Sequence, residues 1–284
     1  MRAPTVAGLR VQVERLLGIT RTDAKRRRNK RKHKWVHPPW GMFTVSGEPI
    51  KSLSMARGLV LVFEGGQFVY PGMSVGHRRE VEFGSRRLML ETLSLRPLVF
   101  GVDGFHADSD RKLMRKLAEP RLASQKSMAG EQMTFLASDA GAGMRKIGQG
   151  IANLTRVPLT FQEEIQVLRR RANPEQRDVQ RDWWDYETFA NEPDIVDMTR
   201  GFYANRMATV LSFLNDDVRG VGGEIAFPTC DAWALRVKPV HGKAIMFYNL
   251  LPDGSGDLSS EYTVCPFASG DMWMSRTWVW NVPQ

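Results

Sequence analysis

The stretch Arg206-Met-Ala-Thr-Val-Leu-Ser-Phe-Leu-Asn-Asp216, followed by Gly222-Gly-Glu-Ile-Ala-Phe-Pro228, decides the fold of this chain. Residues 206–214 are a strand-length apolar run with few charges, which is typical of a strand buried in a layered β core. The paired glycines that open the second string supply the turn chemistry that separates two strands. A further apolar run of this kind, Ala244 to Phe247, indicates that several strands share one core.

Strand-like and helix-like segments extend on both sides of this stretch. Upstream, Asp108 to Leu117 has acidic residues at its start and basic residues later, which suits the dipole of a helix. A second helix is predicted near Met144 to Asn153. The predicted strands are Ile165 to Leu168, Arg206 to Leu214, Ala232 to Val237, Ala244 to Asn249 and Met272 to Trp280. Helices followed by many strands predict an α+β fold whose core is a β-sandwich or a double-stranded β-helix (jelly roll).

The first hundred residues have a different character. Val6 to Leu17 places leucine and valine at helical spacing and predicts a short amphipathic helix. From Leu59 to Leu93, short apolar runs alternate with turn signals such as Pro71-Gly72, as expected for strands and turns. We therefore expect three regions: a basic extension with a short helix and an extended arm at 1–50, a small β appendage at 51–94, and the double-stranded β-helix domain at 95–284.

Length and composition set limits on the class of protein. The chain has 284 residues, of which 42% are hydrophobic, enough for one sizeable core and an extension. No window approaches the roughly 20 consecutive apolar residues of a membrane-spanning helix, so we expect no transmembrane segment. Cys230 and Cys265 are the only cysteines, too few for a disulfide framework in a chain of this length. We expect two buried thiols, which favour a reducing compartment.

The positive charge is concentrated in one short run. The formal net charge is +9, and residues 25–34 supply eight positive charges, so the remainder of the chain is close to neutral. Such a run repels itself and buries nothing apolar, and it cannot fold alone. Lysine and arginine neutralise phosphates while neighbouring aromatic rings stack on unpaired bases. The predicted RNA-binding residues are Lys25, Arg26, Arg27, Arg28, Lys30, Arg31, Lys32, Lys34, Trp35 and Trp40. An acidic protein or membrane surface, a targeting signal and a solvated tail are the alternatives.

Further strings accompany the opening stretch in a fixed order. They are Leu93-Ser-Leu-Arg-Pro-Leu-Val-Phe100, Val102-Asp-Gly-Phe105, Val237-Lys-Pro-Val-His-Gly-Lys-Ala-Ile-Met-Phe247 and Gly270-Asp-Met-Trp-Met-Ser-Arg-Thr-Trp278. Together with the stretch quoted first, they resemble the prolyl 4-hydroxylase-like branch of the iron(II)/2-oxoglutarate oxygenases. The resemblance runs from about Leu90 to the C-terminus. It implies a double-stranded β-helix that holds iron(II) with two imidazoles and one carboxylate.

The resemblance also implies where the ligands of such a site belong. The histidine of the family's His-x-Asp pair matches Trp183, whose indole offers a metal no lone pair, and the aspartate matches Asp185. The distal histidine matches Tyr262, whose phenol, with an ordinary pKa of about 10, substitutes poorly for imidazole. The lysine that pairs with 2-oxoglutarate matches Met272, and a thioether cannot anchor a carboxylate. These three losses predict a protein that is not an enzyme and takes no metal, cofactor or small-molecule substrate.

Neighbouring side chains offer little compensation. Glu261 adjoins Tyr262 but should face the opposite side, because side chains alternate along a strand. Arg276, four residues after Met272, shares its face and could hold an anion. Asp185 is expected to be a strand-end carboxylate bound to backbone. The bulky side chains at the ligand positions are expected to fill the former cavity.

A non-catalytic barrel with a basic arm predicts a structural role. The leading hypothesis is a structural subunit of a large ribonucleoprotein, most of all an organellar ribosome, with the arm on ribosomal RNA and other surfaces on neighbouring protein subunits. A mitochondrial location is favoured over nucleus or cytoplasm. Two alternatives stay open. The first is a working iron(II)/2-oxoglutarate protein hydroxylase that uses Asp185. The second is a protein-binding subunit of a complex without RNA, such as a membrane-bound energy-converting one.

Overall fold

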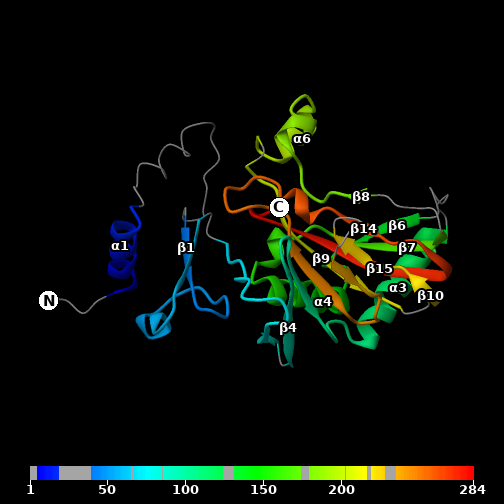
Figure 1. The fold of residues 1–284 in the computed structure, drawn as a ribbon, viewed down its shortest axis with the longest axis horizontal. Coiled ribbons are helices and arrows are strands. Elements are labelled where there is room, and N and C mark those ends of the chain that lie inside the picture. Colours follow the sequence, from blue (N-terminus) through cyan, green and yellow to red (C-terminus); the bar gives the residue numbers. More distant parts are fainter. Residues whose placement is uncertain are drawn as a thin grey trace. The chain divides into compact units, whose positions relative to one another are not determined.

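The structure is a computed structural model that describes residues 5–18, 40–64, 67–84, 86–123, 131–173, 179–201, 203–215, 219–227 and 235–284 (Figure 1). The chain divides into two compact units, Met1–Pro71 and Gly72–Gln284. The predicted RNA-binding residues from Lys25 to Trp35 lie outside the described residues. None of the described helices combines the length and apolar character needed to cross a membrane.

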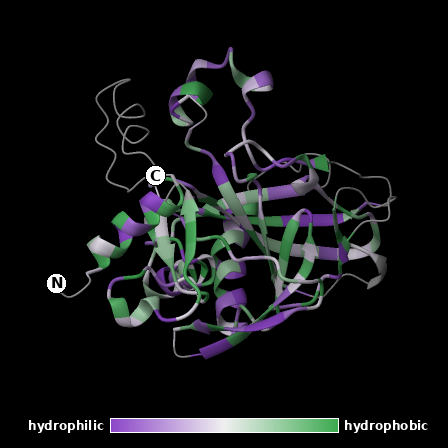
Figure 2. Cartoon of the chain, turned by 60° about the vertical axis from the view of Figure 1, so that its left-hand side comes forward, coloured by the Kyte–Doolittle hydropathy of each residue, from purple (hydrophilic) through white to green (hydrophobic). Residues whose placement is uncertain are grey.

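The first unit packs a helix on a two-stranded sheet. Helix α1 (Val6–Leu16) begins after Thr5, whose hydroxyl accepts a hydrogen bond from the Gly8 backbone N–H at 3.0 Å. The sheet pairs β1 (Trp40–Phe43) with β2 (Leu61–Glu64), and a 3-10 turn, η1 (Leu53–Ala56), lies between them. Hydrophobic and hydrophilic residues alternate along α1 (Figure 2). Its apolar face packs against buried residues of the sheet, which confirms the predicted amphipathic helix.

Trp40 was predicted to bind RNA together with the basic run, but the structure buries it. Its side chain is 2% exposed and belongs to the core of the first unit with Met42 and Ile50. The Arg10 guanidinium lies 4.0 Å from the centre of its ring and donates a hydrogen bond to the Trp40 carbonyl oxygen at 2.9 Å. The sequence could not show this, because Arg10 and Trp40 are separated by the basic run.

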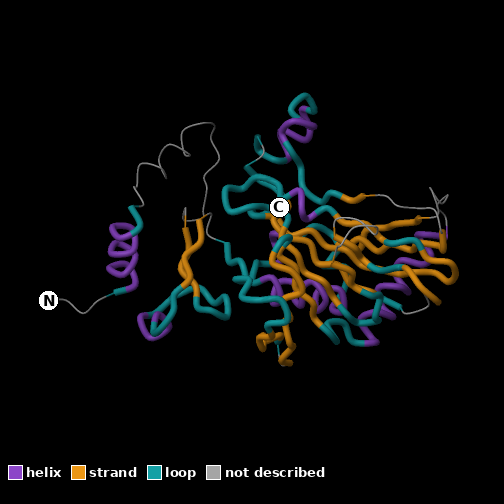
Figure 3. The backbone as a smooth tube through the Cα atoms, in the orientation of Figure 1, coloured by secondary structure: helices purple, strands orange, loops and turns teal. Residues whose placement is uncertain are grey.

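Two antiparallel sheets form most of the second unit (Figure 3). The large sheet runs in the order β3 (Arg78–Phe83), β4 (Arg86–Leu95), β5 (Leu98–Val102), β13 (Ala244–Tyr248), β9 (Arg206–Phe213), β15 (Phe267–Trp280), β7 (Ile165–Asn173) and β6 (Glu131–Leu136), with β10 (Arg219–Gly222) beside β15. The small sheet runs in the order β12 (Leu235–Val237), β11 (Ile225–Phe227), β14 (Tyr262–Val264) and β8 (Val179–Gln180).

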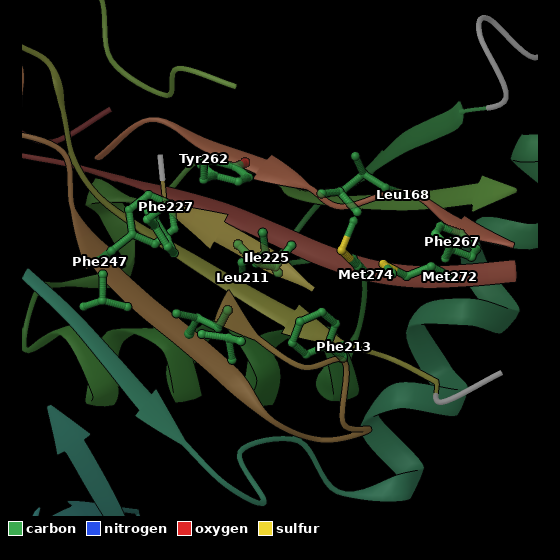
Figure 4. Packing of buried hydrophobic residues seen from close by; sticks show 14 residues of the cluster. Leu168, Leu211, Phe213, Ile225, Phe227, Phe247, Tyr262, Phe267, Met272 and Met274 are labelled. Atoms are coloured by element: carbon green, nitrogen blue, oxygen red, sulfur yellow. The ribbon is translucent and has the colours of Figure 1, made fainter. Parts of the chain in front are cut away.

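The two sheets enclose one hydrophobic core. Leu211 and Met274 reach it from the large sheet, and Ile225, Phe227 and Tyr262 reach it from the small one (Figure 4). Residues of both sheets thus bury their apolar faces against each other, as in a jelly roll. The predicted α+β fold with a double-stranded β-helix core is confirmed.

Helices flank the large sheet on one side (Figure 1). Helix α3 (Asp108–Ala123) packs on β6 and β7, and α4 (Ala142–Thr155) packs on β3 and on a 3-10 turn, η2 (Leu159–Phe161). Both helices were predicted; α3 begins at the predicted residue and runs past the predicted end, and α4 extends beyond the prediction at both ends. The remaining short elements are α5 (Tyr186–Phe189), α6 (Pro193–Met198) and η3 (Leu258–Ser260).

Two features differ from the predictions. The first unit ends at Pro71, whereas the appendage was expected to span 51–94, because the hairpin of β3 and β4 pairs with β5 of the large sheet. An alternating strand pattern looks the same in an appendage and in a main sheet, and only the pairing partner decides. Cys265 is buried and disulfide-bonded, so the expectation of two free thiols is wrong at this residue.

Candidate functional site

One strand carries the side chains that line the centre of the second unit. Side chains alternate along β15, so Met272, Met274, Arg276 and Trp278 share its inner face. The two methionines are apolar and fully buried in the core. Arg276 follows them, and its residue is only 8% exposed. A buried arginine requires partners for its charge and its N–H donors.

The guanidinium of Arg276 meets three oxygen acceptors. Its Nε and Nη2 donate to Oε1 of Gln166 at 2.9 and 2.6 Å. Its Nη1 donates to the phenol oxygen of Tyr262 at 2.7 Å and to Oδ1 of Asp182 at 3.4 Å. All four residues are buried. We call Gln166, Asp182, Tyr262 and Arg276 the guanidinium site.

The guanidinium site draws its members from both sheets. Gln166 lies on β7 directly opposite Arg276 of β15 in the register of the large sheet. Tyr262 opens β14 and pairs with Gln180 of β8, and Asp182 follows two residues later. The small sheet therefore contributes the phenol, the segment that follows its strand β8 contributes the anion, and the large sheet contributes the cation and the amide.

A second layer of polar groups supports Asp182. Its Oδ2 accepts a hydrogen bond from the Thr209 hydroxyl at 2.9 Å, and Thr209 accepts one from Nδ2 of Asn249 at 3.0 Å. The ring of Trp278 lies beside the cation, 4.5 Å from ring centre to Cζ of Arg276. Asp182 thus has two donors, and its position is fixed by neighbours on β9 as well as β15.

The surroundings of the guanidinium site keep both Arg276 and Tyr262 protonated. Burial by itself lowers the pKa of the Arg276 guanidinium, but the neighbouring Tyr262 and Asp182 more than offset this and raise it above the ordinary value. Burial raises the pKa of the Tyr262 phenol well above its ordinary 10.0. At physiological pH the site therefore holds a permanent cation and a neutral phenol.

The structure separates the four positions that the sequence singled out. Tyr262 belongs to the guanidinium site. Met272 is fully buried in the apolar core (Figure 4). Trp183 is also buried, but it packs on the backbone of Gly256, where an added Cβ would lie 2.1 Å from the indole Cε3. Asp185 is not part of the guanidinium site and lies at the start of α5.

Asp185 begins α5 instead of facing the core. Its Oδ1 accepts a hydrogen bond from the Thr188 backbone N–H at 2.7 Å, and its Oδ2 pairs with Nη1 of Arg181 at 3.0 Å. Burial raises the pKa of the Asp185 carboxyl, but these bonds outweigh it and leave the pKa lowered. Arg181 also binds Glu261, which faces away from the core side of Tyr262 as predicted. Asp185 therefore binds backbone as expected, but at the start of a helix and not at the end of a strand.

Sequence reasoning missed Asp182, Gln166 and Thr209. Asp182 lies three residues before Asp185, in the connection between β8 and α5, where no strand periodicity tells which side chain turns to the core. A usable signal was present. Arg276 lies in an otherwise apolar strand, and a buried guanidinium needs a carboxylate from another segment.

Comparisons with known proteins find prolyl 4-hydroxylases. Prolyl 4-hydroxylase 1 of Arabidopsis thaliana is 29% identical over an aligned length of 213, and the match covers 66% of this chain and 71% of that protein. Prolyl 4-hydroxylase subunit alpha-1 of Gallus gallus is 28% identical over an aligned length of 186, and the match covers 61% of this chain and 34% of that subunit. The crystal structure of the viral collagen prolyl hydroxylase of Paramecium Bursaria Chlorella virus-1 is 21% identical, with a TM-score of 0.48, and covers 65% of this chain and 96% of its own. No family model matches.

The chain is similar to prolyl 4-hydroxylases. This similarity raises the question whether the chain could bind iron(II) and 2-oxoglutarate. The residues of the guanidinium site do not fit either group. Of the three oxygen acceptors, only Asp182 is an anion, and no histidine takes part in the hydrogen bonds and ion pairs described for this site. A metal ion beside Asp182 and Tyr262 would meet the positive charge of Arg276 at close range.

The cavity beside Arg276 is too small for a dicarboxylate. A cavity of about 10 Å³ lies beside Arg276 and Tyr262, which is about the room one water molecule needs. Its lining residues are Glu131, Leu168, Arg170, Gln180, Leu211, Tyr262, Val264, Met274 and Arg276. The other guanidinium in this wall, that of Arg170, donates from Nε and Nη2 to Glu131 at 2.9 and 2.5 Å. Both cations are thus engaged by the protein itself.

Proposed function

We propose that the second unit is a prolyl 4-hydroxylase-like barrel that does not catalyse hydroxylation. One observation carries this proposal: the Arg276 guanidinium lies 2.7 Å from the Tyr262 phenol and 3.4 Å from the Asp182 carboxylate, in the buried centre of the barrel. A guanidinium keeps its proton under all physiological conditions. Iron(II) could bind these oxygens only if the Arg276 guanidinium moved away from them. Its positive charge would then be buried without a partner.

The methionine at position 272 supports the same conclusion for the cosubstrate. A dicarboxylate such as 2-oxoglutarate needs a cationic or hydrogen-bonding anchor. Met272 offers a thioether inside an apolar cluster, and the two arginines of the nearby cavity wall already bind Glu131 and Asp182. The barrel therefore serves as a folded scaffold whose surfaces, and not its centre, carry its role.

Turnover of 2-oxoglutarate tests this proposal. The purified full chain is incubated with iron(II), ascorbate and 2-oxoglutarate, with and without a proline-rich peptide, and succinate is measured. A plant prolyl 4-hydroxylase assayed in parallel shows that the conditions support catalysis. We expect no succinate above the level of the buffer. Peptide-stimulated succinate that disappears in the variant Asp182→Asn would overturn the proposal.

An active protein hydroxylase is the second candidate. The similarity to prolyl 4-hydroxylases at 26–29% identity favours it, and these comparisons support it better than they support a ribonucleoprotein subunit. It would require ligands other than those that the sequence alignment suggested. The same succinate assay separates the two candidates.

The structural role in a ribonucleoprotein rests on the sequence of residues 25–34 alone. Its eight cations would release counterions from RNA, so binding should weaken steeply with salt. Deleting this segment should lower RNA affinity and flatten its salt dependence, while the second unit keeps its unfolding midpoint. Unchanged RNA binding, or no co-sedimentation of the full chain with mitochondrial ribosomes, would remove this role.

A further inference from the structure

The small sheet of the second unit has few internal connections. Its four strands are two to three residues long, and β8 pairs with β14 through only two residue pairs. A sheet this small gains little stability from its own hydrogen bonds. Its position against the large sheet depends on the apolar core that the two sheets share and on polar side chains that bridge them.

The guanidinium site is such a bridge. Tyr262 comes from β14 of the small sheet and Asp182 from the segment that follows β8, while Gln166 and Arg276 come from the large sheet. Arg276 uses three nitrogens to reach all three acceptors at 2.6 to 3.4 Å. The surrounding apolar core excludes most competing water, so these contacts are stronger than on a surface.

We infer that Arg276 acts as a built-in cation that cross-links the two sheets, and that its acceptors form a site for a planar organic cation of the guanidinium class. This inference rests on the proposed function, because a bound metal would exclude the guanidinium from this place. Three oxygens converge on one positive group, and Thr209 holds Asp182 from behind at 2.9 Å. The acceptors are therefore ordered by more than Arg276 itself.

A consequence can be tested by removing the tethered cation and supplying a free one. The variant Arg276→Ala leaves a cavity whose walls carry Asp182, Gln166 and Tyr262. Ethylguanidinium reproduces the outer part of the arginine side chain, whereas N-ethylurea has a similar shape but no charge. If the site selects a cation, only the charged compound should restore the link between the sheets.

The measurement is the thermal unfolding midpoint of the full chain, in buffer with a chelator, at increasing concentrations of either compound. We expect Arg276→Ala to unfold at a lower temperature than wild type. Ethylguanidinium at about 100 times its dissociation constant should raise the midpoint of Arg276→Ala by about 5 °C or more. N-ethylurea should not, and neither compound should stabilise wild type or the double variant Asp182→Asn/Arg276→Ala.

The outcomes are separable. No effect of ethylguanidinium on Arg276→Ala, or equal effects of both compounds, would overturn the inference. If Arg276→Ala does not fold, Arg276→Lys and Arg276→Met are compared, and lysine, which keeps the charge, should preserve the higher midpoint; equal midpoints would overturn the inference. Iron uptake by the wild-type chain would instead contradict the proposed function.

Discussion

Asp182 and Arg276 are 94 residues apart in the sequence, yet Nη1 of Arg276 lies 3.4 Å from Oδ1 of Asp182 in the buried centre of the barrel. The pair joins the segment after β8 to β15 and brings one full positive and one full negative charge out of water. Such a pair is costly to separate, because each partner alone would be an uncompensated buried charge.

A double-mutant cycle should reveal this coupling. Arg276→Met should lower the free energy of unfolding by about 3 to 5 kcal/mol, because Asp182 loses its countercharge in the core. Asp182→Asn should also destabilise, but the double variant should lose much less than the two single losses combined. Urea unfolding of the four proteins measures the coupling. Additive losses would show that the two groups do not depend on each other.

Gly256 should not tolerate a side chain. An added Cβ would lie 2.1 Å from Cε3 of Trp183, which is too close for any packed atom. Gly256→Ala should therefore destabilise the second unit by about 1 to 3 kcal/mol through overpacking. Trp183→Leu is the matched test, since a smaller side chain makes room. In the Trp183→Leu background, the added penalty of Gly256→Ala should shrink, and an undiminished penalty would place the clash elsewhere.

Asp185 should matter as a helix cap. Asp185→Ala should reduce stability by about 1 kcal/mol, because the Thr188 backbone N–H loses its acceptor at 2.7 Å. Asn caps helices about as well as Asp, so Asp185→Asn should keep most of the stability despite losing the ion pair with the partly exposed Arg181. Chemical unfolding of the two variants makes the comparison. Equal losses would point to the charge of Asp185 instead of its capping oxygen.

His106 should make the protein sensitive to mild acid. Burial lowers its pKa to about 4, while Asp110 raises it and Arg86, Arg111 and Lys146 lower it further. The unfolded chain then binds more protons between about pH 6.5 and 4, so stability falls as the pH drops through this window. His106 should therefore make the free energy of unfolding about 2 kcal/mol lower at pH 5 than at pH 8. His106→Asn should remove this part of the difference between the two pH values, and an unchanged difference would assign it to other groups.

The fold was largely predictable from the sequence, because its central strands are runs of buried apolar residues. The predicted strand at 206–214 is β9, and that at 244–249 is β13, each within one residue. The bounds of the strand at Tyr262–Val264 were not predicted, because three residues are too few to show a periodic pattern. The extent of the first unit was not predicted either, because β4 joins the large sheet through β5, and β5 pairs with β13, which lies far along the sequence.

The site was predictable only in part. Tyr262 was found, and Arg276 was expected on an inner face with a capacity for an anion, which proves to be the protein's own Asp182. Asp182 itself was missed because it lies in the connection after β8, where the sequence carries no periodic pattern of buried residues. Gln166 was missed because its role depends on lying opposite Arg276 in the sheet.

The iron content of the full chain tests the central claim most directly. The protein is produced with iron in excess, purified without chelator under anaerobic conditions, and its iron per chain is measured by plasma mass spectrometry beside an active prolyl 4-hydroxylase. With Arg276 as the cation of the barrel, the content should be far below one iron per chain and equal in wild type and Asp182→Asn. Near-stoichiometric iron that is lost in Asp182→Asn would contradict the claim.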